Sequence, residues 1–170
     1  MVFVRLSGCN LRCPFCDTDH SAFTQMSGSE IAEEAIRCSL GRPFPERHLC
    51  LTGGEPSLQT DRELIEKLHS EGFIIHIETN GTRPLPPGID WVTLSPKNDA
   101  VLLEEADELK LVMAEGADPE RWHSFPSKHR FLQPCYRPDG SSNTGDTIRY
   151  ILSHPLWRLS LQTHKLLGIR

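Results

Sequence analysis

The sequence lacks the features that mark membrane, secreted and nucleic-acid-binding proteins. No apolar run is long enough to cross a bilayer, and the first residues, MVFVR, do not follow the basic, apolar, small-residue order of a secretory signal. The net charge is −5, and no cluster of Lys and Arg reaches the density of a phosphate-binding surface. We therefore expect a cytoplasmic protein that binds neither nucleic acid nor membrane.

The chain also lacks internal repeats, low-complexity tracts and an evident linker, so we expect one domain over residues 1–170. Short β-rich segments alternate with helical patterns along it. Ser27 and Glu30 have the spacing of a capping box, which predicts the start of a helix. Strands are expected at residues 2–6, 49–51, 73–77, 91–94, 109–113, 130–132 and 159–161, and helices at 61–70, 101–105, 118–123 and 146–153.

Alternating strands and helices imply parallel strands joined by helical crossovers. A complete eight-fold β/α barrel needs roughly 250 residues, which is more than this chain contains. We therefore predict an α/β fold: a partial, open β/α barrel of about six or seven mainly parallel strands.

Most of the unusual polar motifs directly follow the expected strands. They are SGC at residues 7–9, TGGEP at 52–56, ETNG at 78–81, SPK at 95–97, QP at 133–134 and QTHK at 162–165. Because the carboxyl ends of parallel strands open on one face, we expect these motifs to build one site.

Three of the six cysteines crowd into the sequence CNLRCPFC at residues 9–16. Clustered cysteines in a cytosolic protein are more often metal ligands than disulfide partners, whereas Cys38, Cys50 and Cys135 stand alone and are expected to be small buried hydrophobes. A four-iron cluster normally takes four cysteines, so three would leave one iron open to a substrate or cofactor.

A closed zinc site is the alternative interpretation of this loop. His20 follows Cys16 by four residues, so Cys9, Cys13, Cys16 and His20 could form a structural Cys₃His site. Such a site would leave the TGGEP motif unexplained. We therefore favour an iron–sulfur cluster, and with it a redox enzyme.

The C-x3-C-x2-C spacing resembles the signature of the radical S-adenosylmethionine (SAM) enzymes. The resemblance implies that Cys9, Cys13 and Cys16 hold a [4Fe–4S] cluster whose fourth iron is chelated by SAM. One electron from the cluster then splits SAM to methionine and a 5′-deoxyadenosyl radical, which abstracts a hydrogen from the substrate. The TGGEP motif resembles the GGEP-type motif of these enzymes, in which Gly53, Gly54 and Glu55 would hold the SAM amine.

A longer match narrows the resemblance to the 7-carboxy-7-deazaguanine synthase family. It consists of RLSGCNLRCPFCDT at residues 5–18, the ETNG and SPK motifs, and LQTHK at 161–165, in this order. The family converts 6-carboxy-5,6,7,8-tetrahydropterin to 7-carboxy-7-deazaguanine with loss of ammonia, for queuosine biosynthesis. It also implies a one-electron donor such as flavodoxin or ferredoxin, and a homodimer.

The resemblance assigns roles to further residues. Thr18 would be the protein ligand of Mg²⁺, although from the residues alone it is a turn hydroxyl. The substrate contacts would be Arg5, Thr79 and the carboxylate of Arg170, and the SAM contacts Gly81, Ser95, Pro96, Lys97 and Gln133. His164 is either a substrate-side hydrogen-bonding group or a solvated side chain.

Two rival functions and one departure from the family remain. An activating enzyme for a glycyl-radical protein would use the same cysteine loop, and a zinc-stabilised binding module would have no radical chemistry. Family members usually carry an upstream Gln-Gly-Glu-Gly segment, which the sequence from Met1 onward does not contain. We expect that this upstream segment is missing and that activity is reduced without it.

Overall fold

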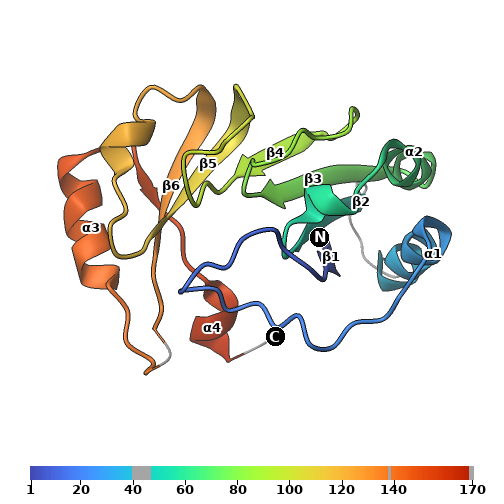
Figure 1. The fold of residues 1–170 in the computed structure, drawn as a ribbon, viewed down its shortest axis with the longest axis horizontal. Coiled ribbons are helices and arrows are strands. Elements are labelled where there is room, and N and C mark those ends of the chain that lie inside the picture. Colours follow the sequence, from blue (N-terminus) through green and yellow to red (C-terminus); the bar gives the residue numbers. More distant parts are fainter. Residues whose placement is uncertain (40–46, 138, 169–170) are drawn as a thin grey trace. The chain divides into compact units, whose positions relative to one another are not determined.

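The computed structural model describes residues 1–39, 47–137 and 139–168 (Figure 1). The chain divides into two compact units, Met1–Leu103 and Glu104–Arg170, and each is described by itself. The expectation of a single domain over residues 1–170 stays a prediction.

The first unit is built from four parallel strands and the helices that connect them. The strands β1 (Val2–Leu6), β2 (Arg47–Gly53), β3 (Phe73–Thr79) and β4 (Trp91–Leu94) pair in chain order. Their connections contain α1 (Gly28–Ser39), the 3₁₀ helix η1 (Pro56–Leu58) and α2 (Arg62–Ser70). Helices α1 and α2 lie side by side next to the strands (Figure 1). These are the crossovers that the alternating pattern predicts.

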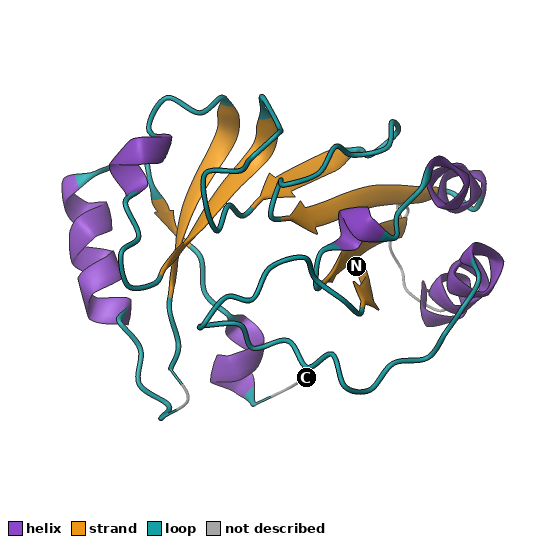
Figure 2. Ribbon diagram, viewed as in Figure 1, coloured by secondary structure: helices purple, strands orange, loops and turns teal. Residues whose placement is uncertain are grey.

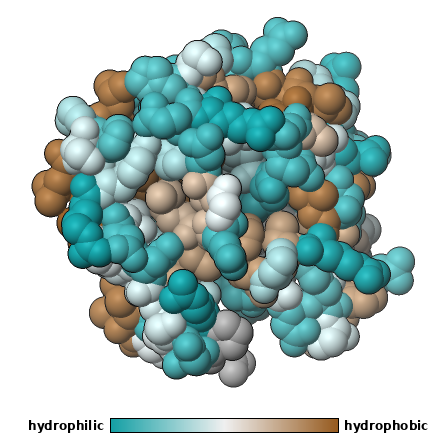
Figure 3. Space-filling model, turned by 60° about the vertical axis from the view of Figure 1, so that its left-hand side comes forward, coloured by the Kyte–Doolittle hydropathy of each residue, from teal (hydrophilic) through white to brown (hydrophobic). Residues whose placement is uncertain are grey.

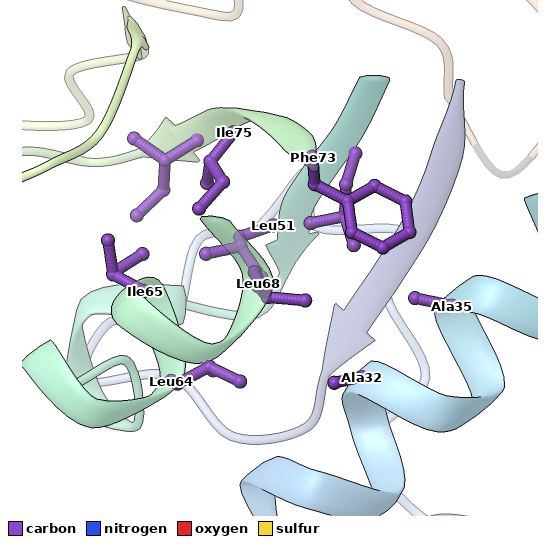
Figure 4. Close-up of a cluster of buried hydrophobic side chains, with 10 residues drawn as sticks. Ala32, Ala35, Leu51, Leu64, Ile65, Leu68, Phe73 and Ile75 are labelled. Carbon is purple, nitrogen blue, oxygen red and sulfur yellow. The ribbon is translucent and has the colours of Figure 1, made fainter. Parts of the chain in front are cut away.

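One face of these strands forms the hydrophobic core of the first unit. Side chains of a strand alternate between its two faces, so Leu51 of β2 and Ile75 of β3 point toward the helices, where Ala32 of α1 and Leu68 of α2 meet them (Figure 4). All four are buried. The small alanines let α1 approach the strands closely, and the opposite face is left for polar residues such as Thr52 and Glu78.

Both helices of the first unit begin as local sequence signals predict. The backbone N–H of Ser27 donates to the carboxylate of Glu30 at 2.7 Å, and the N–H of Glu30 donates to Ser27 Oγ at 3.3 Å, which confirms the capping box. The carboxylate of Asp61 caps α2 by accepting from the N–H of Leu64 at 2.9 Å.

The second unit contains three parallel strands in chain order. They are β5 (Ala106–Met113), β6 (Ser127–Pro134) and the short β7 (Arg158–Leu159). Along the chain, the 3₁₀ helix η2 (Pro119–Trp122) follows β5, and α3 (Thr144–Ser153) connects β6 to β7. The short helix α4 (Thr163–Leu167) follows β7 (Figure 2). The described residues thus hold seven strands, which confirms the α/β class and the partial, open barrel with six or seven mainly parallel strands.

Two local predictions are wrong. The helix expected at residues 101–105 is a loop, because the N–H of Leu102 donates to the carbonyl of Gly81 at 2.8 Å and holds the segment against the turn after β3. The last strand is shorter and earlier than residues 159–161, and α4 was not predicted.

The described surface is mainly polar where it is seen in Figure 3, and its strongly hydrophobic residues lie mostly near the margins of that view. None of the helices in the described ranges combines the length and the apolar character that a membrane crossing requires.

Candidate functional site

The cysteine loop begins where β1 ends. Cys9 and Cys13 are half-buried and Cys16 is exposed, and all three are free thiols. A turn joins the last two, because the N–H of Cys16 donates to the carbonyl of Cys13 at 3.0 Å. The N–H of Leu11 points at Cys9 Sγ at 3.4 Å. The loop therefore offers three sulfur ligands on a short and locally structured segment.

His20 closes this loop through two hydrogen bonds to residues at its start. Its Nδ1 accepts a hydrogen bond from the backbone N–H of Gly8 at 3.1 Å, and its carbonyl accepts a longer bond of 3.4 Å from Ser7 Oγ. The two ends of the cysteine segment are thereby held together.

Within the described ranges, no three or more His, Cys, Asp or Glu side chains are arranged to hold one metal ion. A zinc site requires its ligands to converge on a single ion, whereas a four-iron cluster takes each sulfur on a different iron. The loop keeps three free thiols, each of which a four-iron cluster could take on a different iron.

The SPK motif after β4 lies against the cysteine loop. Lys97 Nζ is 5.9 Å from the centre of the Phe15 ring and donates to Ser95 Oγ at 2.6 Å. Burial raises the pKa of the Cys13 thiol, the charge of Lys97 acts in the opposite direction, and Cys16 and Cys9 raise it further. The pKa of the Cys13 thiol is therefore raised overall, and the Lys97 ammonium offsets part of that rise in the neighbourhood that it shares with the three thiols.

The paired glycines allow the end of β1 to lie directly on the end of β2. The N–H of Gly54 donates to the carbonyl of Leu6, and the N–H of Glu55 donates to that of Gly8, both at 2.9 Å. A Cβ on Gly54 would come within 1.9 Å of the Gly8 oxygen, and Gly53 has a φ of +114°. The glycines thus allow a close approach between two segments of the chain's own backbone, which fixes the start of the cysteine loop.

Glu55 is completely buried, and both of its carboxylate oxygens are engaged. Oε1 accepts from the N–H of Ser57 at 3.1 Å, from Ser57 Oγ at 2.6 Å and from Thr79 Oγ1 at 2.6 Å. Oε2 accepts from the N–H of Asn80 at 2.7 Å. The carboxylate therefore joins the TGGEP segment to the ETNG turn, a role that the sequence did not reveal, and its predicted bond to the SAM amine stays a prediction.

The remaining SAM candidates of this unit line the same edge. The N–H of Ser95 donates to the carbonyl of Thr79 at 2.7 Å, and the N–H of Gly81 donates to Thr79 Oγ1 at 3.0 Å. Gly81 has a φ of +75°, and a Cβ there would lie 2.4 Å from Leu94 Cδ1. Pro96 is buried beside Ser95. Thr79 is only 2% exposed, and its hydroxyl is engaged within the turn, so its predicted contact with the substrate stays a prediction.

Thr18 lies near the glycine pair. Its hydroxyl donates to the carbonyl of Gly53 over a long 3.4 Å, so the oxygen retains lone pairs that could face a cation. This contact joins the end of the cysteine loop to the end of β2, and the predicted Mg²⁺ ligation stays a prediction.

Arg5 heads a row of polar side chains across the strand face opposite the core. It pairs in register with Thr52, Thr52 Oγ1 donates to Glu78 Oε2 at 3.3 Å, and Glu78 pairs with Thr93. Arg5 itself is exposed and lies 5.8 Å from the centre of the Phe3 ring. Sequence reasoning missed Thr52 and Glu78, although each is the first residue of a motif and the strand period of two places both on one face.

Two further candidate residues, Gln133 and His164, lie in the second unit. Gln133 is half-buried on β6 and pairs in register with Val112. His164 is exposed on α4, which is typical of a solvated side chain, and Arg170 lies outside the described residues.

Of the three isolated cysteines, Cys50 is buried, as predicted, but Cys38 is exposed and Cys135 half-buried. The prediction fails for Cys38 because it lies on the solvent side of α1, where its Sγ is 3.6 Å from a carboxylate oxygen of Glu34.

The residues present fit a cluster and a cofactor at the edge of the first unit. The loop supplies free thiols close to one another and to a cation, and no disulfide competes for them. The backbone groups and small residues that surround the loop come from the ends of β1, β2, β3 and β4, which brings four of the six motifs to one edge; the convergence of the other two stays a prediction.

Comparison with known proteins gives consistent results. The family model described as the Radical SAM superfamily matches residues 3–113. The chain is 50% identical over 170 residues to a 7-carboxy-7-deazaguanine synthase of Bacteroides thetaiotaomicron, covering 99% of this chain and 87% of that protein. It is 43% identical to a protein of the same name from Bordetella pertussis, covering 99% and 89%. Among solved structures, the crystal structure of QueE from Escherichia coli superposes with a TM-score of 0.69 at 28% identity, covering 94% of this chain and 84% of that one.

Proposed function

The chain belongs to the Radical SAM superfamily and, within it, to the 7-carboxy-7-deazaguanine synthase family, and from this membership we propose how its residues carry out that family's reaction. The protein is a radical SAM lyase that forms 7-carboxy-7-deazaguanine. The family implies a [4Fe–4S] cluster and SAM, which together supply the hydrogen-abstracting radical chemistry when bound. The rest of the proposal concerns what this chain's own residues contribute.

The observation that carries the proposal is the convergence of four strand ends around the cysteine loop. We assign Cys9, Cys13 and Cys16 as the cluster ligands, and place SAM between the loop and the edge formed by Gly53 to Glu55, Gly81 and Ser95 to Lys97. Lys97 supports this placement because it reaches both Phe15 of the loop and Ser95 of the edge. Its positive charge offsets the charge of the thiolates.

Glu55 acts on SAM mainly through the backbone that it positions. All of its contacts come from donors: the two from Ser57 hold the segment after β2, and those from Thr79 and Asn80 draw the ends of β2 and β3 together. A fixed edge with exposed backbone groups can orient the methionine part of SAM without reorganisation. We expect this preorganisation to be part of what the chain contributes to the rate.

The pterin substrate belongs beside the polar row of Arg5, Thr52 and Glu78. Arg5 is exposed, and its planar fork suits the carboxylate of the substrate. Glu78 offers its carboxylate as an acceptor to the polar edge of the ring, and Thr52 orients that carboxylate by donating its hydroxyl to Oε2. Thr18 is proposed as the protein ligand of Mg²⁺, with substrate oxygens and waters completing the coordination.

Further parts of the proposal lie outside the first unit. Gln133 is proposed as a SAM contact and Arg170 as a substrate contact through its carboxylate, as the family resemblance implies. The electron is proposed to come from a flavodoxin- or ferredoxin-type donor, and the active protein is proposed to be a homodimer that binds no nucleic acid.

An activity assay tests the proposal directly. The protein is reconstituted anaerobically with iron and sulfide and incubated with SAM, dithionite, Mg²⁺ and 6-carboxy-5,6,7,8-tetrahydropterin. The expected product is 7-carboxy-7-deazaguanine, formed together with 5′-deoxyadenosine and lost when Cys13 is replaced by serine. Formation of 5′-deoxyadenosine without the deazaguanine, both for this chain and with an upstream family segment fused to it, would overturn the substrate assignment.

A further inference from the structure

Three polar side chains form a closed ring of hydrogen bonds beside the cysteine loop. Asn80 Nδ2 donates to Asn10 Oδ1 at 3.1 Å, Asn10 Nδ2 donates to Thr82 Oγ1 at 2.8 Å, and Thr82 Oγ1 donates to Asn80 Oδ1 at 2.7 Å. Each side chain gives one bond and accepts one within the ring. Rings of this kind polarise their members in the same sense, so the bonds reinforce one another.

The orientation of this ring is fixed from its buried side. The backbone N–H of Thr82 donates to Asn80 Oδ1 at 2.9 Å, which leaves the amino group of Asn80 facing Asn10. The backbone N–H of Asn80 donates in turn to the buried carboxylate of Glu55 at 2.7 Å. Asn80 is 6% exposed, while Asn10 is exposed on the loop. The bonds therefore run from the buried interior of the edge outward to one loop residue.

Asn10 occupies the position directly after the first proposed cluster ligand, Cys9. It is anchored to a turn 70 residues away in the sequence, at the end of β3. Together with the closure by His20, this anchor gives the loop a second fixed point that lies between Cys9 and Cys13. A loop held only at its ends could move its middle residues, and with them the sulfur positions.

We propose that the Asn10–Asn80–Thr82 ring is a positioning device that fixes the cysteine loop in its cluster-binding geometry. The proposal rests on the assignment of the cluster to Cys9, Cys13 and Cys16. In this proposal the three ring residues act through the loop and not on the reacting atoms. The ring acts by lowering the freedom of the loop, and it thereby slows the release of iron from the bound cluster.

The test compares two variants of Thr82, one without and one with the hydroxyl group that the hydrogen-bond ring requires. Thr82→Val keeps the shape of the side chain and removes the hydroxyl, whereas Thr82→Ser keeps the hydroxyl and removes the methyl group. After anaerobic reconstitution, the rate of iron transfer to a chelator is measured for both variants, for Asn10→Ala and for the Thr82→Val/Asn10→Ala double variant. Chemical denaturation of the iron-free proteins reports overall stability.

The expected result is a roughly three- to tenfold faster iron release for Thr82→Val and Asn10→Ala, the effect of losing one or two hydrogen bonds. Thr82→Ser should release iron at the rate of the unchanged protein. The double variant should be no faster than the faster single variant, because either change opens the same ring.

Equal iron release by the valine and serine variants would overturn the proposal and leave the function intact. So would additive effects in the double variant, or an acceleration fully matched by the loss of stability in the iron-free protein. Failure of the unchanged protein to hold a cluster would overturn both the ring's role and the proposed function.

Discussion

The carboxylate of Glu55, which lies completely buried after the paired glycines, accepts a hydrogen bond of 2.6 Å from the hydroxyl of Thr79 at the end of the next strand. This contact joins two residues of different motifs that lie 24 positions apart in the sequence. The edge of the first unit is thus held together by one carboxylate and several donors, and these donors satisfy a glutamate side chain that reaches no solvent.

Replacing Glu55 with glutamine should destabilise the protein while preserving its volume. All the groups around the carboxylate are donors, so the amide NH₂ of glutamine would face another donor. We expect the free energy of unfolding to fall by about 1.5–3 kcal/mol, the range for a hydrogen bond to a charged group. Urea denaturation of the iron-free protein measures this. The control Glu33→Gln, on an exposed position of α1, should change it by less than about 0.5 kcal/mol.

A methyl group on Gly54 should displace the start of the cysteine loop. The added Cβ would meet the Gly8 oxygen at 1.9 Å and the His20 ring at 2.9 Å, so the backbone of one strand end has to move. We expect Gly54→Ala to lose most of its bound iron after reconstitution, measured as iron per chain. The matched change Gly145→Ala, where the nearest atom is the flexible end of Arg149 at 3.7 Å, should keep the iron content of the unchanged protein. Equal iron contents would contradict the packing described here.

His20 should be replaceable by asparagine but not by alanine. The Oδ1 of asparagine can take the place of Nδ1 as the acceptor for the Gly8 N–H, whereas alanine offers no acceptor. We expect His20→Asn to retain iron after reconstitution and His20→Ala to lose it faster to a chelator. Asparagine is a poor zinc ligand, so retained zinc in unchanged protein together with metal loss in His20→Asn would instead support a Cys₃His zinc site.

The stabilising contribution of Asp90 should be lost in acid. Partial burial raises its pKa, but the hydrogen bonds from the backbone N–H of Ile75 and from the ring of His69 outweigh this and lower the pKa overall. A lowered pKa contributes stability that is fully present above the unfolded value of about 3.9 and is lost as the pH falls through the folded value. Unfolding free energies measured from pH 7 to pH 3 should therefore decline less steeply below about pH 4 for Asp90→Asn. Parallel curves for the two proteins would contradict this assignment.

Local signals in the sequence predicted much of the fold. The helix starts at Ser27 and Asp61 follow from side chains that bond to nearby backbone groups, and these bonds are present. The gathering of the motifs after β1 to β4 at one edge was predicted because parallel strands place their carboxyl ends on the same side of the sheet. The expected helix at residues 101–105 failed because a contact with Gly81, distant in sequence, decides its conformation.

The connections within the site could not be predicted in the same way. Asn80 donates hydrogen bonds to Glu55 and to Asn10, which lie 25 and 70 positions away in the sequence. No periodicity or local propensity reports such pairs. His20 was assigned to a possible zinc site on spacing alone, whereas its hydrogen bond to Gly8 depends on the path of the loop in space.

Electron paramagnetic resonance of the reduced, reconstituted protein tests the central claim most directly, because it reports on the iron that the three cysteines leave open. We predict the signal of one [4Fe–4S]⁺ cluster per chain, with g values that shift when SAM is added. A protein that holds zinc and gives no such signal, or a cluster signal that SAM leaves unchanged, would contradict the account.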